Sequence, residues 1–327
     1  MKFLGQLLVV ALVFGSSISY LMAQAGGDTP EKHVAAAKAA AGQEHLGLFA
    51  RVCTDPDPAP AAPAAGDAQP RPTGPPPASQ WHVEPAKVFD NLFFVGQKDV
   101  SSWAVTTSAG IIIIDSIWEY SVEDEIVGGL KKLGLNPADI KYVIVSHGHG
   151  DHVGGAKYLQ DHFGAKIVLS AADWDLVYKD IRPEIRPKRD IVATDGQKIT
   201  LGDETITVYV TPGHTPGALS MLIPVKDHGE PHLAAQWGGT AFNFAPTRPN
   251  FQVYIDSARR FGEIAGKAGA DVMIANHTAT DGTITKLPLV AKRKPGEPHS
   301  YVSTKDTAKR YMKVAEECAT AAMLRVK

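Results

Sequence analysis

The sequence has little cysteine, no excess of charge of either sign, and no apolar stretch long enough to span a bilayer comfortably. Only two of its 327 residues are cysteines, Cys53 and Cys318, so a CxxC pair or a cysteine-rich zinc cluster is excluded. Lysine and arginine together number 33 against 35 aspartates and glutamates. Such a balance gives the chain no electrostatic attraction to nucleic acid or to an anionic membrane surface.

Two common catalytic and cofactor motifs are also missing. The chain contains no GxSxG nucleophile turn, and the glycines at 148, 150 and 154 miss the GxGxxG spacing by one residue. A serine-hydrolase elbow and a dinucleotide site are therefore not predicted. The overall composition, 44% hydrophobic and 21% charged, is that of an ordinary globular protein.

The first 25 residues have the pattern of a signal peptide. Lys2 supplies a positive start, residues 4–14 are apolar, and Ala23-Gln24-Ala25 fits the small-x-small cleavage pattern. The alternative is a membrane anchor, but the apolar stretch is short and serines interrupt it at 16, 17 and 19. We expect cleavage after Ala25 and a periplasmic or secreted protein that does not bind the membrane afterwards.

Residues 26–80 read as an N-terminal extension to a folded domain over 81–327. Residues 31–51 are rich in alanine and predict a helix, whereas nine of the 25 positions in 55–79 are proline and predict a semi-stiff linker. In an oxidising compartment a Cys53–Cys318 disulfide would tie this extension to the C-terminal helix. Two free buried thiols are the alternative.

Within residues 81–327, predicted strands alternate with predicted helices, but hairpins are present as well. Strands are expected over 87–96, 101–108, 110–116, 140–146, 166–170, 218–225, 232–239 and 270–276, and a hairpin over 198–212. Helices are expected over 122–134, 154–164, 171–180, 251–269 and 304–324. This combination predicts an α/β (α+β) fold with two mixed sheets flanked by helices.

The stretch SHGHGDH, residues 146–152, follows a buried strand and concentrates metal-binding side chains. His147 and His149 lie two positions apart, so in an extended or turn backbone their side chains point the same way. Asp151 and His152 are adjacent and diverge, so they can serve a second ion. Glycines between the ligands let the backbone turn tightly. The motif therefore predicts part of a metal site.

Two further histidines occur at the ends of strands. His214 lies in TPGHTPG and His277 lies in IANHT. A lone histidine at a strand end is more often structural, but three such segments share one edge of a sheet if the strands pair as expected. Together they predict a metal centre.

These motifs resemble those of the metallo-β-lactamase superfamily: HGHGDH is similar to its HxHxDH motif, TPGHTPG to its second histidine turn and IANHT to its last histidine position. The resemblance covers about residues 81–290 and implies a four-layer αβ/βα sandwich with two Zn²⁺ ions. It implies that the first ion binds His147, His149 and His214, and the second binds Asp151, His152 and His277. Asp115 resembles the family's buried aspartate that supports the metal loop, although a simple strand-end cap would explain it too.

Details of the motifs narrow the resemblance. Position 149 is histidine rather than the glutamate of the di-iron branch. Glyoxalase- and lactonase-like members carry a bridging aspartate where Gly238 and Gly239 stand here, and both cysteines lie outside the matched region. The chain is thus most similar to the metallo-β-lactamases whose ligands are histidine apart from one aspartate, although Thr240 alone stands where that subclass has serines that hold the substrate carboxylate.

The resemblance implies hydrolysis of a small-molecule β-lactam by a metal-bound hydroxide, with Asp151 as a ligand that also orients or receives a proton. The alternatives are a lactonase or thioesterase of the same fold, and a binding module without catalysis. A basic loop over residues 182–189 would either attract an anionic substrate or lie solvated. Trp103 and Trp237 would either wall the site or pack in the core.

Overall fold

The computed structural model describes residues 27–53 and 74–327, so the predicted signal peptide and most of the predicted linker lie outside the described residues. The described strands are β1 (Ala86–Lys87), β2 (Leu92–Phe94), β3 (Trp103–Thr107), β4 (Gly110–Ile114), β5 (Ile140–Ile144), β6 (Lys166–Ser170), β7 (Ile191–Ala193), β8 (Gln197–Leu201), β9 (Glu204–Val210), β10 (Leu219–Asp227), β11 (Glu230–Trp237) and β12 (Val272–Ala275). The described α-helices are α1 (Pro30–Ala41), α2 (Leu46–Val52), α3 (Ala78–Trp81), α4 (Gly128–Lys132), α5 (Gly150–Val153), α6 (Ala156–Phe163), α7 (Ala171–Asp180), α8 (Arg248–Ala268), α9 (Thr278–Asp281), α10 (Thr283–Lys292) and α11 (Thr307–Arg325). Among these helices none is both long enough and apolar enough to cross a bilayer.

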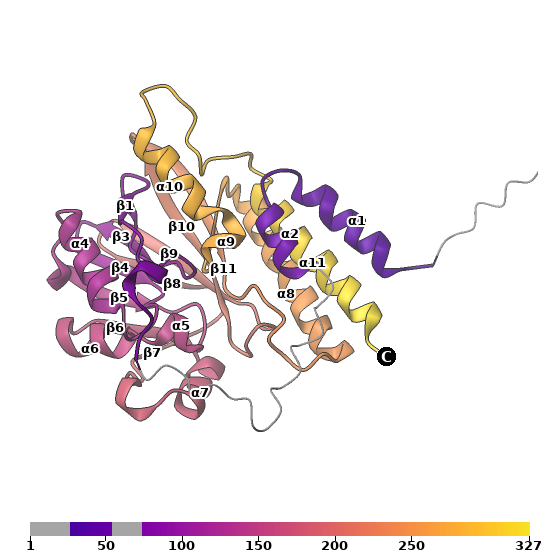
Figure 1. The fold of residues 1–327 in the computed structure, drawn as a ribbon, viewed down its shortest axis with the longest axis horizontal. Helices are drawn as coiled ribbons and strands as arrows, with labels where there is room; N and C mark the ends of the chain where they lie inside the picture. Colours follow the sequence, from indigo (N-terminus) through magenta and orange to yellow (C-terminus); the bar gives the residue numbers. More distant parts are fainter. Residues whose placement is uncertain (1–26, 54–73) are drawn as a thin grey trace, which may run out of the picture.

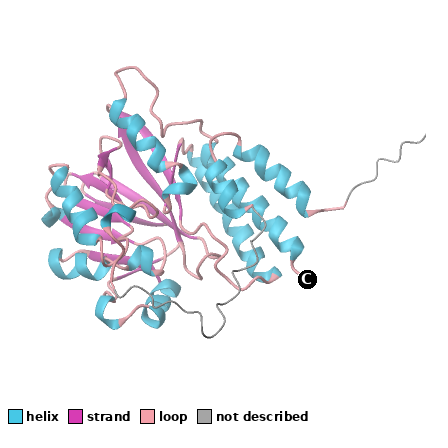
Figure 2. Cartoon of the chain, viewed as in Figure 1, coloured by secondary structure: helices cyan, strands magenta, loops and turns pink. Residues whose placement is uncertain are grey.

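The strands form two mixed sheets, as predicted. The first has the order β1-β2-β3-β4-β5-β6-β7, antiparallel up to β4 and parallel beyond it. The second has the order β12-β11-β10-β9-β8 and is antiparallel except for the β11–β12 pair. In Figures 1 and 2 the sheets lie between a group of helices that includes α4 and α6 and a group formed by α1, α2, α8 and α11.

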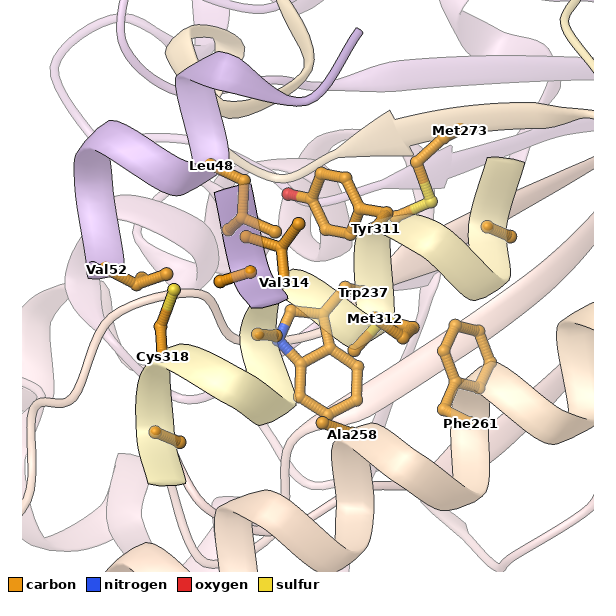
Figure 3. Packing of buried hydrophobic residues seen from close by; sticks show 14 of the residues in the cluster. Leu48, Val52, Trp237, Ala258, Phe261, Met273, Tyr311, Met312, Val314 and Cys318 are labelled. Carbon is orange, nitrogen blue, oxygen red and sulfur yellow. The ribbon is translucent and has the colours of Figure 1, made fainter. Parts of the chain in front are cut away.

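Alternation along the strands builds three apolar layers. Ile112 and Ile114 of β4 face the core between the sheets, whereas Ile111 and Ile113 face the helices that cover the first sheet. Trp237 of β11 belongs to the third cluster, where the outer face of the second sheet meets α8 and α11 (Figure 3). Two faces buried on each sheet give the predicted four-layer sandwich.

The N-terminal extension is part of the outer helical layer. The predicted helix over 31–51 is wrong in one respect: α1 ends at Gly42, whose φ of 53° favours glycine, and α2 begins only at Leu46. Both helices pack on α11 (Figure 1), and the Cys53–Cys318 disulfide is confirmed, with the two Cα atoms 4.8 Å apart. A Cβ at Gly47 would overlap the carbonyl oxygen of Ala279, so α2 also lies directly against α9.

Several local predictions differ from the structure. The predicted strand over 87–96 is two short antiparallel strands, and the helix over 122–134 opens with a π-helical turn, Glu123–Val127, before α4. The strands predicted over 218–225 and 232–239 are longer in the structure, and Asp227 and Glu230 are opposite each other in the β10–β11 register beside a tight turn. The strand β7 and the helices α9 and α10 were not predicted, since they are short or, in α10, contain an internal proline.

Candidate metal centre

Three chain segments bring the predicted ligands to one edge of the sandwich. His147 and His149 lie in the loop after β5, and the short helix α5 follows at once with Asp151 and His152. The other two histidines come from the second sheet. His214 lies in the turn between β9 and β10, and His277 directly precedes α9 after β12. The ring of His214 packs against that of His147, and the ring of His277 packs against that of His152.

The first three histidines converge closely. Nε2 of His214 lies 3.1 Å from Nε2 of His147 and 3.1 Å from Nδ1 of His149. Nitrogens bound to one zinc ion at about 2.0–2.1 Å in a tetrahedral arrangement are separated by about 3.3 Å. The observed spacing therefore fits three ligands of one ion.

The hydrogen bonds of the rings fix which nitrogens face one another. Nδ1 of His147 donates to the carbonyl oxygen of Gly238 (2.9 Å), and Nδ1 of His214 donates to that of Ala241 (2.6 Å). In a neutral imidazole the other nitrogen is then an acceptor. Two Nε2 lone pairs thus point at each other, which is unfavourable unless a cation lies between them. This donor set fits a divalent metal such as zinc.

The remaining three residues form a second, looser set. Oδ2 of Asp151 lies 3.3 Å from Nε2 of His152 and 3.7 Å from Nε2 of His277, and these two nitrogens are 3.4 Å apart. His277 is also held through Nδ1, which donates to the carbonyl oxygen of Asp99 (3.0 Å). His147 sits between the sets, with one nitrogen also near Asp151 and His152. The pattern of two adjacent sets agrees with the prediction of two ions, whose number and identity stay predictions.

Burial keeps the first set neutral. It lowers the pKa of His214 to about 3, lowers the pKa of His147 well below its usual value, and lowers the pKa of His149. Neutral imidazoles are the form that binds metal. At neutral pH these three side chains need no proton loss before they can accept a cation.

In the second set, the carboxylates beside His152 favour the protonated form of its ring. Burial opposes the positive charge on His152, but Asp151 and Asp115 overcome it and raise the pKa of His152 to about 10. Burial likewise works against ionisation of Asp151, yet the neighbouring His152 holds the pKa of Asp151 well below its ordinary value. A metal ion would take the place of this proton, so binding there releases one.

Asp115 supports the metal loop, in agreement with the resemblance. Its Oδ1 accepts a hydrogen bond from the backbone N–H of Ser146 (2.6 Å), and its Oδ2 accepts from Nδ1 of His152 (3.1 Å). Asp115 is fully buried and has a φ of 59°, and Ile117 is also buried and has a φ of 52°. Positive φ is costly for a β-branched residue, so the strand end after β4 stores strain where it meets the ligands.

Two supporting residues were missed in the sequence. Asn276 is fully buried, and its Nδ2 donates to the carbonyl oxygen of Gly238, the same atom that orients His147. Asp173 is also fully buried and bonds to two of the ligand turns. Asn276 could have been noticed because it precedes a predicted ligand. Asp173 looked like an ordinary acidic residue in the first turn of a helix.

A hollow of about 540 Å³ adjoins His149 and His214. Its other lining residues come from α7, the 212–216 turn, the segment before α8 and α8 itself, and none is a lysine or arginine: Leu176, Asp180, Pro212, Gly213, Thr215, Pro216, Asn243, Phe244, Asn250 and Val253. Its volume suits a small substrate, and its lining combines apolar surface with two side-chain amides. Because its lining includes the carboxylate of Asp180 and no lysine or arginine, the hollow does not favour binding of an anionic group.

The residues considered as pocket walls or as anchors for a substrate make contacts within the protein instead. Trp103 and Trp237 are buried in the core, which confirms the packing alternative. The hydroxyl of Thr240 is buried and donates to Oδ1 of Asn276 (3.2 Å). In the basic loop, Arg182 pairs with Glu119. In the same loop, Arg189 forms an ion pair with Asp175, and Arg186 donates a hydrogen bond to the carbonyl oxygen of Ile181.

Comparisons with known proteins point to one family. Residues 95–228 match the family model described as "Metallo-beta-lactamase superfamily". A crystal structure of BJP-1, a subclass B3 metallo-β-lactamase of Bradyrhizobium japonicum, superimposes with a TM-score of 0.59 at 26% identity, covering 71% of this chain and 90% of that one. No cysteine belongs to the candidate ligand groups among the described residues, in keeping with the predicted subclass.

Curated relatives include other hydrolases of small molecules. An N-acyl homoserine lactonase of a Bacillus species is 31% identical over 153 residues, which is 44% of this chain and 59% of the relative. A hydroxyacylglutathione hydrolase of Acidiphilium cryptum is 36% identical over 83 residues, 25% of this chain and 30% of that protein. The matches therefore span little more than half of the first relative and under a third of the second.

Proposed function

We propose that this chain is a zinc-dependent hydrolase of the metallo-β-lactamase superfamily, and that it opens the strained amide ring of a β-lactam. The observation that carries the hydrolase proposal is the convergence of acceptor nitrogens from His147, His149 and His214. The six predicted ligands would hold two ions. A lactonase-type hydrolase is the second candidate, favoured by the named activity of the Bacillus relative.

Bound zinc lowers the pKa of a coordinated water to near 7 and polarises a carbonyl oxygen. The residues of this chain bind and orient around that chemistry. His147 and His214 keep their rings fixed through bonds to backbone carbonyls, and His152 is fixed through Asp115. Asp151, partly exposed beside the second set, is the residue that we propose receives or orients a proton at its carboxylate.

The segment after β11 favours the β-lactam proposal over the lactone one. An aspartate that bridges two ions would stand at Gly238 or Gly239 by the resemblance. A Cβ at Gly238 would overlap the backbone of Leu219, and a Cβ at Gly239 would overlap the ring of His214. Neither position accepts a side chain without a backbone shift. A bridging carboxylate of the lactonase kind is therefore absent from this part of the site.

Arg51 is the candidate partner for a substrate carboxylate. Arg51 lies one helical turn after Gly47 and is therefore on the face of α2 that meets α9. The helix α9 begins directly after His277. Burial lowers the pKa of His277 to about 4, and the positive charge of Arg51 contributes in the same direction. We propose that the carboxylate faces Arg51, and that the hollow beside His149 takes the neutral side group.

Export completes the proposal. The signal-peptide pattern of residues 1–25 and the Cys53–Cys318 disulfide both suit an oxidising compartment outside the cytoplasm. We propose a periplasmic or secreted enzyme with small-molecule substrates.

Hydrolysis of a chromogenic cephalosporin and of an N-acyl homoserine lactone, each with and without a chelator, tests these alternatives. We expect chelator-sensitive cleavage of the cephalosporin and slower cleavage of the lactone. Preferential cleavage of the lactone would overturn the β-lactam assignment but keep the hydrolase. No metal-dependent cleavage of either compound, in protein shown to contain zinc, would count against the hydrolase itself.

A further inference from the structure

One buried carboxylate connects the two turns that carry the first three histidines. Asp173, in the first turn of α7, accepts hydrogen bonds at Oδ2 from the backbone N–H of Gly148 (2.8 Å) and from the hydroxyl of Thr215 (2.8 Å). Its Oδ1 accepts from the backbone N–H of Gly217 (2.8 Å). All three donors are therefore satisfied by a single side chain that is 0% exposed.

The donors lie next to the ligands themselves. Gly148 separates His147 from His149, and Thr215 follows His214 directly. The turn with His147 and His149 follows β5 of the first sheet, whereas the turn with His214 joins β9 and β10 of the other sheet. The carboxylate thus spans the join between the sheets where the three nitrogens have to meet.

Asp173 is itself held firmly. The hydroxyl of Ser170 accepts a hydrogen bond from its backbone N–H, and the next residue, Trp174, is fully buried against the first sheet. The turns also approach α7 closely. A Cβ at Gly217 would overlap the hydroxyl of Ser170, and a Cβ at Gly148 would press on the carbonyl oxygen of Asp173. The helix end therefore acts as a fixed reference for both turns.

We propose that Asp173 is a positioning residue that sets the spacing between the two histidine turns, and thereby the affinity of the three-histidine set for its ion. This inference rests on the proposed function in so far as that set binds zinc. A carboxylate is required because all three neighbours are donors. In Asp173→Asn one oxygen becomes an NH₂ group, which faces a donor and forces one of the turns away.

Asp281 provides a matched control for the loss of a buried carboxylate. It is 3% exposed and accepts from the backbone N–H groups of Ala275 (2.8 Å) and Thr283 (2.9 Å) and from the hydroxyl of Thr283 (2.9 Å). The number and type of bonds are the same as at Asp173. Its bonds stay within residues 275–283, however, and reach neither turn of the three-histidine set.

The experiment measures zinc affinity directly, by competition with a chromophoric chelator, in metal-free protein. Each aspartate is changed to asparagine in the full chain and also in a His277→Ala background, which leaves only the three-histidine set complete. We expect Asp173→Asn to weaken zinc binding to that set by about 10- to 100-fold. Asp281→Asn should change it by less than about threefold, while thermal unfolding shows that both metal-free variants lose stability.

Two milder substitutions at Thr215 keep the proposal testable if Asp173→Asn does not fold. Thr215→Val removes one of the three donors, and Thr215→Ser keeps it. Weaker zinc binding in the valine variant, with the serine variant close to the parent, supports the positioning role. Equal affinities in the valine and serine variants, or equal losses in the two asparagine variants, overturn it.

The outcome is separable from that of the proposed function. Zinc binding by the parent chain without hydrolysis would defeat the proposed activity and leave the positioning test intact. Absence of zinc binding in the parent chain would overturn both.

Discussion

The metal edge and the outer helical layer are stabilised in opposite ways. At the edge, buried polar groups such as Asp115, Asp173 and Asn276 hold turns in fixed positions, partly against an unfavourable backbone conformation. In the outer layer, α1, α2, α8 and α11 pack apolar side chains together (Figure 3). A disulfide closes this layer. One region is organised for ligand geometry and the other for stability.

This difference separates two kinds of mutational effect. Loss of a polar partner at the edge moves ligand atoms by a small distance, to which metal binding is sensitive. Loss of a bond in the helical layer lowers the free energy of unfolding but leaves the ligands where they are. Variants from the two regions should therefore separate activity from stability.

The largest effect is expected from His147→Ala at the edge. This ligand lies between the two sets, so its removal should reduce kcat/KM by roughly 10³-fold or more, because zinc supplies several kcal/mol of transition-state stabilisation. Cephalosporin turnover in zinc-saturated buffer gives the comparison. Activity within tenfold of the parent would show that this histidine is no ligand.

Cys53→Ser tests the helical layer. The disulfide closes a loop with a sequence separation of 265 residues, so its loss should lower the free energy of unfolding by about 2–5 kcal/mol. Denaturant unfolding measures the change, and Cys318→Ser should reproduce it. A large fall in kcat at a temperature where the variant is fully folded would contradict the separation of the two regions.

His45 gives the same layer a pH dependence. Burial lowers its pKa to about 4 in the folded chain, against 6.5 as the ordinary value. Between these values the unfolded chain binds more protons, so this contribution to stability is complete above pH 6.5 and is lost as the pH falls toward 4, by up to roughly 3 kcal/mol. Unfolding of the parent and of His45→Gln from pH 7 to 4 should show a shallower slope in the variant. Identical slopes would show that His45 does not contribute to the pH dependence of unfolding.

Asp115→Asn affects the edge more moderately. The variant keeps one acceptor oxygen but loses the charge beside His152, and we expect about a 10- to 100-fold loss of zinc affinity. Chelator competition measures it. Unchanged affinity would reduce Asp115 to the strand-end cap that the sequence also allowed.

Arg51→Ala should have the smallest effect. An exposed charge pair contributes up to about 1 kcal/mol, so KM for a β-lactam carboxylate should rise roughly two- to fivefold with little change in kcat. Arg51→Lys keeps the charge and serves as the control. An equal rise of KM for an uncharged ester substrate would exclude recognition of the carboxylate.

The sequence was sufficient for the parts of the molecule that follow a local pattern. Short apolar strands and the histidine motifs at their ends predicted the two sheets and the meeting of residues as distant as His149 and His214. The break at Gly42 was not predicted, because an alanine-rich stretch leads up to it and further helix-forming residues follow it. Asp173 was missed for a different reason: its role depends on donors 25 to 44 residues away, which no local spacing reveals.

The most direct test of the central claim is a crystal structure of zinc-loaded protein, with diffraction data measured on both sides of the zinc absorption edge. We predict one anomalous peak within about 2.0–2.2 Å of Nε2 of His147, Nδ1 of His149 and Nε2 of His214. A second peak is expected beside Asp151, His152 and His277. Zinc found elsewhere on the protein, with these side chains free of metal, would contradict the account.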